Sequence, residues 1–233
     1  MKLITVFSFL IFSSLSFGQE LSGEQLLEKA IRYHDPSGQW ETFSGAFTVA
    51  LETPDKPDRL STITLNLPES HFKLSTVQDG NMMVREINGT VCIQSEADGT
   101  LLETTIDDER CNRTLMYRNY YSYLYGLPMK LKDPGTIVDP KVHPAMFKGK
   151  EYLVLKVSYA ADVGSDVWQF YFDPETYAME VYQFFKGSDV TTGEYILLSD
   201  EFVVNDIRMP KDRAWYYNKD NGYLGTDKLI SSK

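Results

Sequence analysis

The chain has 233 residues, a formal net charge of −10, and 13% aromatic residues. Such an acidic chain is a poor candidate for binding nucleic acid or anionic lipid headgroups, because both require a basic surface. The length suits one large β domain or two small ones, and no linker or repeat divides it.

The N-terminus is typical of an exported protein. Lys2 precedes an apolar run over residues 3–15, and small residues at 16–18 fit a cleavage site. We therefore expect a signal peptide at 1–18 and one mature domain at 19–233, periplasmic or secreted. The apolar run is too short to cross a membrane, no later stretch forms a transmembrane segment, and no cysteine near the cleavage site could carry a lipid.

The chain has two cysteines, Cys92 and Cys111. An even number in an exported chain favours a disulfide over free buried thiols or a metal-binding pair. No histidine lies close to either cysteine in the sequence, so we expect no metal site. The bridge would join a strand ending near Gln94 to the start of a central helix.

A short amphipathic helix is expected near the start of the mature chain. Ser22 and Gln25 fit a capping box, and an apolar face over 26–31 follows before a turn at 35–38. From there the hydrophobic period changes to two. The expected strands are 40–53, 60–67, 71–77, 82–87, 91–95, 151–159, 166–172, 178–185, 194–204 and 207–217.

Two connections between these strands stand out. Asn88-Gly89 is the strongest hairpin signal in the chain. Residues 129–150, broken by three prolines, are expected to be irregular, and a segment of this length is either functional or a lid.

A tyrosine-rich stretch at 115–128 is the one helix expected among the strands. Apolar and aromatic side chains recur in it at helical spacing: Met116, Tyr120, Tyr123, Leu124 and Leu127. Acidic residues at 107–109 favour a helix start, and Gly126 and Pro128 favour its end. A lone aromatic helix needs a concave sheet to lie against. Its stripe then either fills the core or lines the mouth of a cavity.

The strand expected at 166–172 is apolar on both faces. Its side chains form two sets that point in opposite directions, with Trp168, Phe170 and Phe172 in one set and Val167, Gln169 and Tyr171 in the other. A sheet with one solvated face alternates more cleanly. We therefore expect a mainly β (α+β) fold, in which a single curled antiparallel sheet forms a half-open β-barrel covered or plugged by helices.

Three segments resemble a group of uncharacterised exported proteins of Gram-negative bacteria that share a domain of unknown function. They are YLYGLPMKLKDPGT at 123–136, FKGKEYLVLKV at 147–157 and AWYYNKD at 214–220. The order of elements, with YFDPET at 171–176 and FVVNDIRMP at 202–210, is similar to that of LolA/LolB-like lipoprotein-localisation proteins. Their sheet is a half-open β-barrel covered by helices.

The LolA/LolB-like resemblance implies a soluble periplasmic carrier for an apolar or lipidic ligand, such as the acyl chains of a lipoprotein. It also implies an inward-facing arginine that holds helices to the barrel, for which Arg59 is one candidate among several. The aromatic helix and the strand faces together suggest five residues for the cavity lining: Tyr120, Tyr123, Leu124, Trp168 and Phe170.

No enzyme motif accompanies these features. None of the three histidines is paired with a nucleophile, and no hydrolase elbow, metalloprotease motif or phosphate-binding loop is present. We expect a non-enzymatic protein without cofactor or metal. Two alternatives stay open. One is an envelope interaction module whose concave face is filled by its own helix, and the other is an unrecognised hydrolase that uses paired carboxylates.

Overall fold

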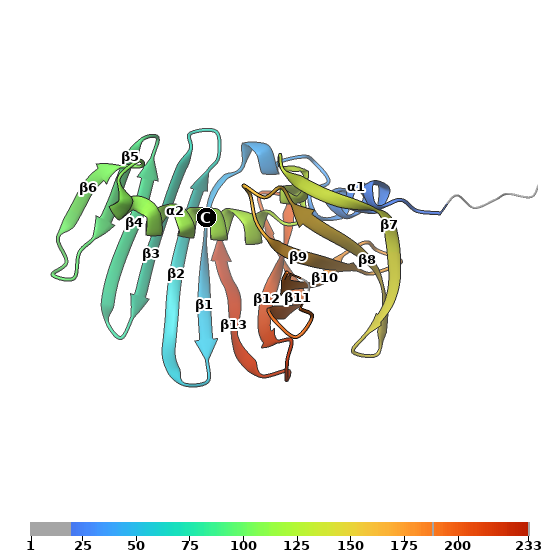
Figure 1. Cartoon of the computed structure of the whole chain (residues 1–233). Coiled ribbons are helices and arrows are strands. Elements are labelled where there is room, and N and C mark those ends of the chain that lie inside the picture. The colour runs from blue at the N-terminus through green and yellow to red at the C-terminus, as the bar shows by residue number, and fades with distance from the viewer. Residues whose placement is uncertain (1–19, 188, 233) are drawn as a thin grey trace, which may run out of the picture.

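The computed structural model describes residues 20–187 and 189–232, so the expected signal peptide at 1–18 lies outside the described residues. The described strands form one 13-stranded antiparallel sheet, which curls around two helices (Figure 1). In chain order they are β1 (Ser44–Thr53), β2 (Lys56–Asn66), β3 (His71–Gln78), β4 (Asn81–Asn88), β5 (Val91–Ser95), β6 (Leu101–Thr105), β7 (Thr136–Phe147), β8 (Lys150–Tyr159), β9 (Asp166–Phe172), β10 (Met179–Lys186), β11 (Glu194–Val204), β12 (Ile207–Tyr217) and β13 (Tyr223–Ser232). The expected mainly β, half-open fold is confirmed.

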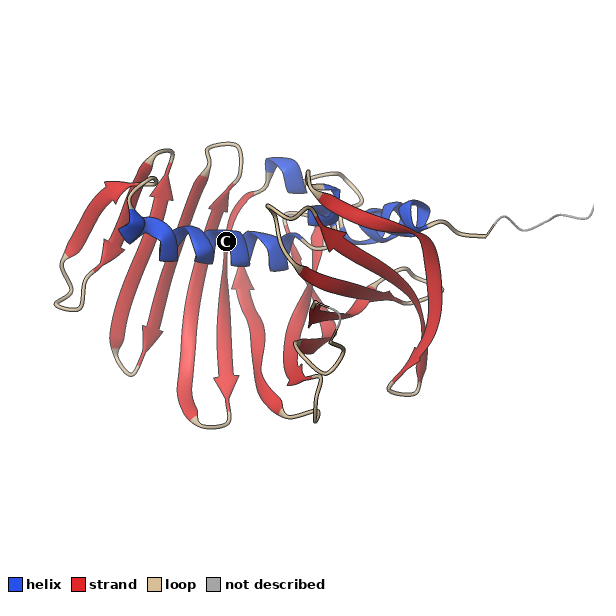
Figure 2. Ribbon diagram, in the orientation of Figure 1, coloured by secondary structure: helices blue, strands red, loops and turns tan. Residues whose placement is uncertain are grey.

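The sheet consists of two meanders joined by its first and last strands. Its order is β6-β5-β4-β3-β2-β1-β13-β12-β11-β10-β9-β8-β7, so β1 pairs with β13 in the middle. The consecutive strands β6 and β7 therefore lie at opposite edges. The chain between them has to cross the sheet, and the second helix makes this crossing (Figure 2).

The first helix, α1 (Gly23–His34), has the expected capping box, with Ser22 and Gln25 bonded reciprocally. It packs against β7 at one end of the sheet. His34 is buried at its last turn, where Nδ1 donates to the Arg208 carbonyl at 2.7 Å and Nε2 accepts from the Met179 amide at 2.9 Å. Burial lowers the pKa of His34, so a neutral imidazole joins α1 to β12 and β10.

The second helix, α2 (Asn112–Gly126), follows a 3₁₀ turn, η2 (Glu109–Cys111), and starts slightly earlier than expected. The helix ends at Gly126, as expected, but the φ of Gly126 is not positive, so no left-handed cap is formed there. The reason for a glycine here is packing. The Trp40 ring occupies the space that a Cβ on Gly126 would need, so only glycine lets the helix end approach it.

Several strand boundaries differ from expectation. The strand expected at 40–53 begins with a 3₁₀ turn, η1 (Trp40–Thr42), and the sequence did not predict β6 or β13. The Asn88-Gly89 hairpin is confirmed. Gly89 has a φ of 58°, which is the left-handed conformation that this tight turn requires.

The prediction of an irregular lid at 129–150 is wrong. The segment forms a 3₁₀ turn, η3 (Met129–Lys132), and then β7, which pairs with β8. Pro134 precedes β7, and Pro140 and Pro144 are tolerated within it because β7 is an edge strand with ladder bonds on one side only. Pro140 lies where the β7–β8 register shifts, and a bulge needs no amide donor there.

Apolar side chains are buried on both faces of the β8–β10 region, as the pattern of 166–172 predicted. Trp168, Phe170 and Phe172 face the main core, which lies between the sheet and the helices. Tyr171 faces a smaller cluster on the opposite side, whose buried members are Tyr152, Val154, Tyr171 and Val181. The curled sheet therefore has one large apolar interior and one small outer patch.

Cys92 on β5 and Cys111 at the start of α2 form the expected disulfide, with Cα atoms 6.1 Å apart and both residues fully buried. Replacing both cysteines with alanine is expected to lower the free energy of unfolding by about 2–5 kcal/mol, because the open chain gains conformational entropy. Urea unfolding of the oxidised parent and the double variant measures this difference. Equal stabilities, or alkylation of both thiols in folded, unreduced parent protein, would contradict the prediction.

Candidate functional site

Helix α2 lies across the concave side of the sheet and buries only part of the stripe that its sequence suggested, namely Leu124 and Leu127. Tyr121, Leu124 and Tyr125 are buried, and the Tyr125 ring packs on Phe47 of β1 with centroids 4.5 Å apart. Met116 and Tyr120, expected in the apolar stripe, are 52% and 41% exposed. Tyrosines at five positions of one helix make its apolar face ambiguous in sequence.

One buried arginine holds the C-terminal end of α2 to the sheet. Arg213 of β12 is only 1% exposed, and its Nη2 donates to the Leu124 carbonyl at 3.4 Å. Its guanidinium also lies 3.9 Å from the Tyr125 ring centroid, and Nη1 donates to the Pro210 carbonyl at 3.0 Å. The last carbonyls of a helix lack partners within it and carry partial negative charge, so a cation stabilises this end.

Arg213 therefore points inward from the sheet and contacts the helix. Arg59, named as a candidate from the sequence, lies on β2 beneath the same helix. Its Nε is buried, and no hydrogen bond joins it to α2 in the described part of the chain. Of these two arginines, Arg213 is the one that donates to α2, and Arg59 as the inward-facing arginine stays a prediction.

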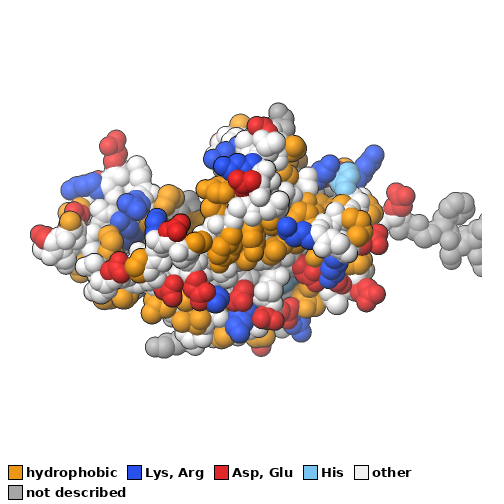
Figure 3. All heavy atoms as spheres, turned by 90° about the horizontal axis from the view of Figure 1, so that it is seen from below, with side chains coloured by type: hydrophobic (Ala, Val, Ile, Leu, Met, Phe, Trp, Pro, Cys, Tyr) orange, Lys and Arg blue, Asp and Glu red, His pale blue; other side chains and the backbone are white. Residues whose placement is uncertain are grey.

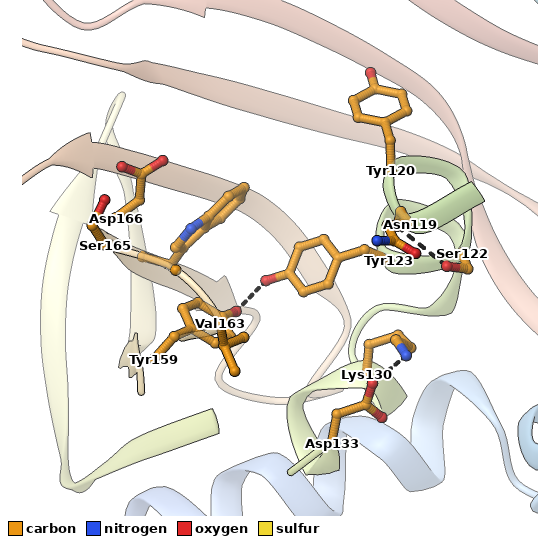
Figure 4. Close-up of a pocket in the computed structure, with 12 residues that line it drawn as sticks. Asn119, Tyr120, Ser122, Tyr123, Lys130, Asp133, Tyr159, Val163, Ser165 and Asp166 are labelled. Carbon is orange, nitrogen blue, oxygen red and sulfur yellow. Dashed lines mark hydrogen bonds and ion pairs between the residues drawn. The ribbon is translucent and has the colours of Figure 1, made fainter. Parts of the chain in front are cut away.

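A first pocket of about 680 Å³ opens between α2, η3 and the loop that joins β8 to β9. We call it the tyrosine pocket; its lining residues are Asn119, Tyr120, Ser122, Tyr123, Lys130, Asp133, Tyr159, Val163, Gly164, Ser165, Asp166 and Trp168. Figure 4 shows Tyr123 reaching from α2 toward Tyr159, while Tyr120 points away from both. The two hydroxyls of Tyr123 and Tyr159 are hydrogen-bonded.

The tyrosine pocket is polar at its edges and aromatic along one wall. The Tyr123 ring meets the Trp168 ring edge-on at 5.6 Å, and Lys130 forms an ion pair with Asp133. Burial raises the pKa of Tyr159 to about 12, so its hydroxyl stays neutral at ordinary pH. Neutral hydroxyls can orient a ligand but supply neither a general base nor a nucleophile here.

A second pocket of about 330 Å³ lies on the other side of Tyr120, against the strands. We call it the strand pocket; its lining residues are Leu51, Thr53, Arg59, Tyr120, Glu194, Trp215, Leu224, Gly225 and Asp227. Trp215 Nε1 donates to Asp227 Oδ2 at 3.0 Å. Burial raises the pKa of Asp227, although the charges of Arg213 and Arg59 act against this rise. Tyr120 lines both pockets, so the two share a wall.

Three of the five residues expected to line a cavity line a pocket in the structure, and two lie in the core. Tyr120, Tyr123 and Trp168 line the tyrosine pocket. Leu124 and Phe170 are 4% and 0% exposed and lie in the core behind it. No pattern in the sequence indicated Tyr159, the loop at 160–165 or the strand pocket as part of the lining. The strand pocket depends on β13, which the sequence did not predict because residues 223–232 lack a clear alternation of apolar and polar side chains.

No group of three or more His, Cys, Asp or Glu side chains is placed to hold a metal ion within 20–187 and 189–232. Over the same residues, none of the helices is both long enough and apolar enough to span a membrane.

Comparison with known proteins identifies the family. The profile of a family of unknown function, DUF6503, matches residues 2–232. The chain belongs to this family. The match confirms the resemblance to proteins with a domain of unknown function, and the DUF6503 chain has no match among curated proteins.

Solved structures similar to this DUF6503 chain share its fold at low sequence identity. A LolA superfamily protein from Nitrosomonas europaea is 10% identical, with 91% of this chain and 93% of that chain covered and a TM-score of 0.55. A putative outer membrane lipoprotein-sorting protein domain from Vibrio parahaemolyticus is 12% identical, with coverage of 91% and 92% and a TM-score of 0.53. A DUF1329 family protein from Desulfovibrio piger is 8% identical, with the same coverage and a TM-score of 0.54. These matches confirm the LolA/LolB-like fold.

Replacing Arg213 with methionine should loosen the C-terminal half of α2. Hydrogen bonds to a charged group contribute about 1.5–3 kcal/mol, so amide exchange over 121–126 should accelerate by roughly one to two orders of magnitude. Hydrogen exchange followed by mass spectrometry measures the change. Arg208→Met is the matched control, because Arg208 also lies on β12 but donates to the Tyr33 carbonyl of α1 at 2.6 Å. Equal acceleration of α2 in both variants would show that Arg213 has no specific role.

Proposed function

We propose that this DUF6503 protein is an exported, non-enzymatic carrier that holds an apolar or lipidic ligand beside α2, in the tyrosine and strand pockets. The observation that carries the proposal is the shared wall at Tyr120, which joins two pockets of about 680 and 330 Å³. Ligand pockets are commonly about 300–1,000 Å³ and combine apolar walls with a few polar groups. Both pockets fit that description.

The lining supports an acyl chain better than a compact polar ligand. Tyr120, Tyr123, Trp168 and Trp215 provide long aromatic surfaces, and Leu51 and Leu224 extend the apolar wall in the strand pocket. An extended hydrocarbon gains free energy in proportion to the apolar area that it buries, at about 25 cal/mol per Å². Figure 3 shows, from below, hydrophobic side chains gathered in the middle of the molecule with charged side chains around them.

Because β7 is a paired strand and not a lid, access to the pockets would depend on movement of α2. Helix α2 is attached at its start by the Cys92–Cys111 disulfide and near its end by Arg213. A small rotation of α2 between these attachments would move Tyr120 and so change the width of both pockets. The structural neighbour described as a lipoprotein-sorting domain supports a carrier of this type, and a lipoprotein is therefore one proposed cargo.

We also propose that the protein works in the periplasm or outside the cell. The charged start, the apolar run at 3–15 and the small residues at 16–18 support export, and a buried disulfide fits an oxidising compartment. N-terminal sequencing of native protein should begin at or near Gln19. Native protein that retains Met1 would contradict the export proposal.

The carrier proposal predicts saturable binding of a fluorescent fatty acyl probe to delipidated protein. Tyr120→Glu should weaken binding about tenfold or more, because it places a carboxylate in the wall shared by both pockets. Tyr123→Glu places a carboxylate in the tyrosine pocket alone and should also weaken binding of the probe. Fluorescence titration measures affinity, and circular dichroism verifies that the variants stay folded.

Tyr223→Glu is the matched control. Tyr223 is 43% exposed, close to the 41% of Tyr120, but it packs on Tyr216 and lines neither pocket. Its replacement should leave probe affinity unchanged. If the delipidated parent binds no acyl probe, the carrier proposal is wrong, and the interaction module without a small ligand takes its place.

A further inference from the structure

Three arginines surround a small pocket beside the first half of α2. Arg59 of β2, Arg85 of β4 and Arg113 of α2 line this space of about 170 Å³, which we call the arginine pocket. The other lining residues are uncharged, among them Tyr117 and Tyr121. None of the lining residues is acidic, although acidic residues outnumber basic ones 33 to 23 in the whole chain. Such a concentration of positive charge is a local feature that net charge conceals.

None of the three guanidinium groups forms an ion pair within the described residues. Arg85 Nη1 donates to Gln94 Oε1 at 2.9 Å and to Thr114 Oγ1 at 3.4 Å, and both acceptors are neutral. Arg59 Nε is buried without a hydrogen-bond partner. The acidic groups that act on the cluster do so from beyond ion-pair distance, Glu96 on Arg85 and Asp227 on Arg59.

The Tyr117 ring brings two of the arginines together. The Cζ atoms of Arg85 and Arg113 lie 5.8 and 5.9 Å from its centroid. Burial and the charge of Arg113 both lower the pKa of Arg85, which shows that the two cations repel each other. Arg113 also lies in the first turn of α2, where the helix dipole disfavours a positive charge.

Stability alone does not explain this arrangement, because three like charges close together and without an ion pair oppose folding. A bound anion would replace the repulsion among the three arginines with attraction. Each guanidinium can donate two parallel hydrogen bonds to a carboxylate or phosphate, and such charge-assisted bonds are about twice as strong as neutral ones. The buried Nε of Arg59 would also gain an acceptor.

We propose that the arginine pocket binds the anionic group of the ligand, a carboxylate or a phosphate, so that the carrier takes an anionic amphiphile. This inference rests on the proposed carrier function. Arg59 lines both the arginine pocket and the strand pocket, and Tyr120 lines both the strand pocket and the tyrosine pocket. The three pockets therefore form a series along α2, with a cationic end for the headgroup and aromatic walls for the chain.

The experiment compares two fluorescent acyl probes that differ only in the headgroup, a free carboxylate and its methyl ester, on delipidated protein. The parent should bind the carboxylate about tenfold tighter than the ester, because the ester loses the charge-assisted hydrogen bonds. Arg85→Gln and Arg113→Gln should each remove most of this preference and leave ester affinity unchanged. Arg113 is exposed, so Arg113→Gln serves as the test should Arg85→Gln fail to fold.

Arg118→Gln is the control, because it removes the same charge from the same helix but at a position outside the arginine pocket. It should retain the preference. Inorganic phosphate is titrated in parallel to separate a free anion from a headgroup. Phosphate that competes with the carboxylate probe and not with the ester supports the proposal. Phosphate that binds through Arg85 without displacing either probe overturns the link to the amphiphile.

The outcomes separate this inference from the carrier function. Equal affinity for carboxylate and ester in the parent overturns the headgroup site and leaves the carrier intact. If neither acyl probe binds, the carrier function itself fails and the amphiphile proposal falls with it. If Arg118→Gln removes the preference for the carboxylate probe as fully as Arg113→Gln does, the preference depends on the total charge of the protein. That result would also overturn the headgroup site.

Discussion

The order of strands requires one segment to cross the concave side of the sheet. Because β1 pairs with β13, the chain leaves β6 at one edge and enters β7 at the other. An α-helix of 15 residues covers about 22 Å at 1.5 Å per residue, and α2 with its flanking 3₁₀ turns provides this crossing. The helix that covers the core is thus also the connection between the two meanders, and the pockets exist because it lies there.

The two attachments of α2 differ in kind. The Cys92–Cys111 bridge fixes the start of the helix to β5 covalently, whereas Arg213 holds the end through a carbonyl and an aromatic ring. A guanidinium whose partners are uncharged can exchange them at a lower cost than a buried ion pair. The C-terminal half of α2, which carries Tyr120, Tyr123 and Tyr125, is consequently held by non-covalent contacts alone.

The sequence predicted the fold well where local patterns decide it, and less well where tertiary context does. The capping box at Ser22, the Asn88-Gly89 turn and the two faces of 166–172 depend on near neighbours, and the structure has all of them. Local sequence does not show that a strand lies at the edge of a sheet. The prolines of 129–150 therefore predict an irregular segment where the structure has β7. The lining was predicted only in part, because an all-round aromatic helix does not show which tyrosine faces a pocket.

The three arginines of the arginine pocket also show what local sequence patterns cannot predict. Arg59, Arg85 and Arg113 are far apart in the sequence, and each is an ordinary surface residue when considered alone. The pairing of β2, β3 and β4 and the crossing of α2 bring them to one place. Total charge, which argued against anionic partners, averages over the whole surface and cannot detect such a site.

The prolines of β7 also bear on how an open sheet limits pairing at its edges. A half-open barrel leaves two terminal strands whose free backbone groups could recruit a strand from another molecule. On β7, Pro140 and Pro144 lack amide donors, and the bridge between Ser22 and Lys141 occupies part of the edge. On the opposite side, β6 has only five residues. Both borders are therefore poor templates for edge-to-edge aggregation, which protects a protein whose sheet never closes.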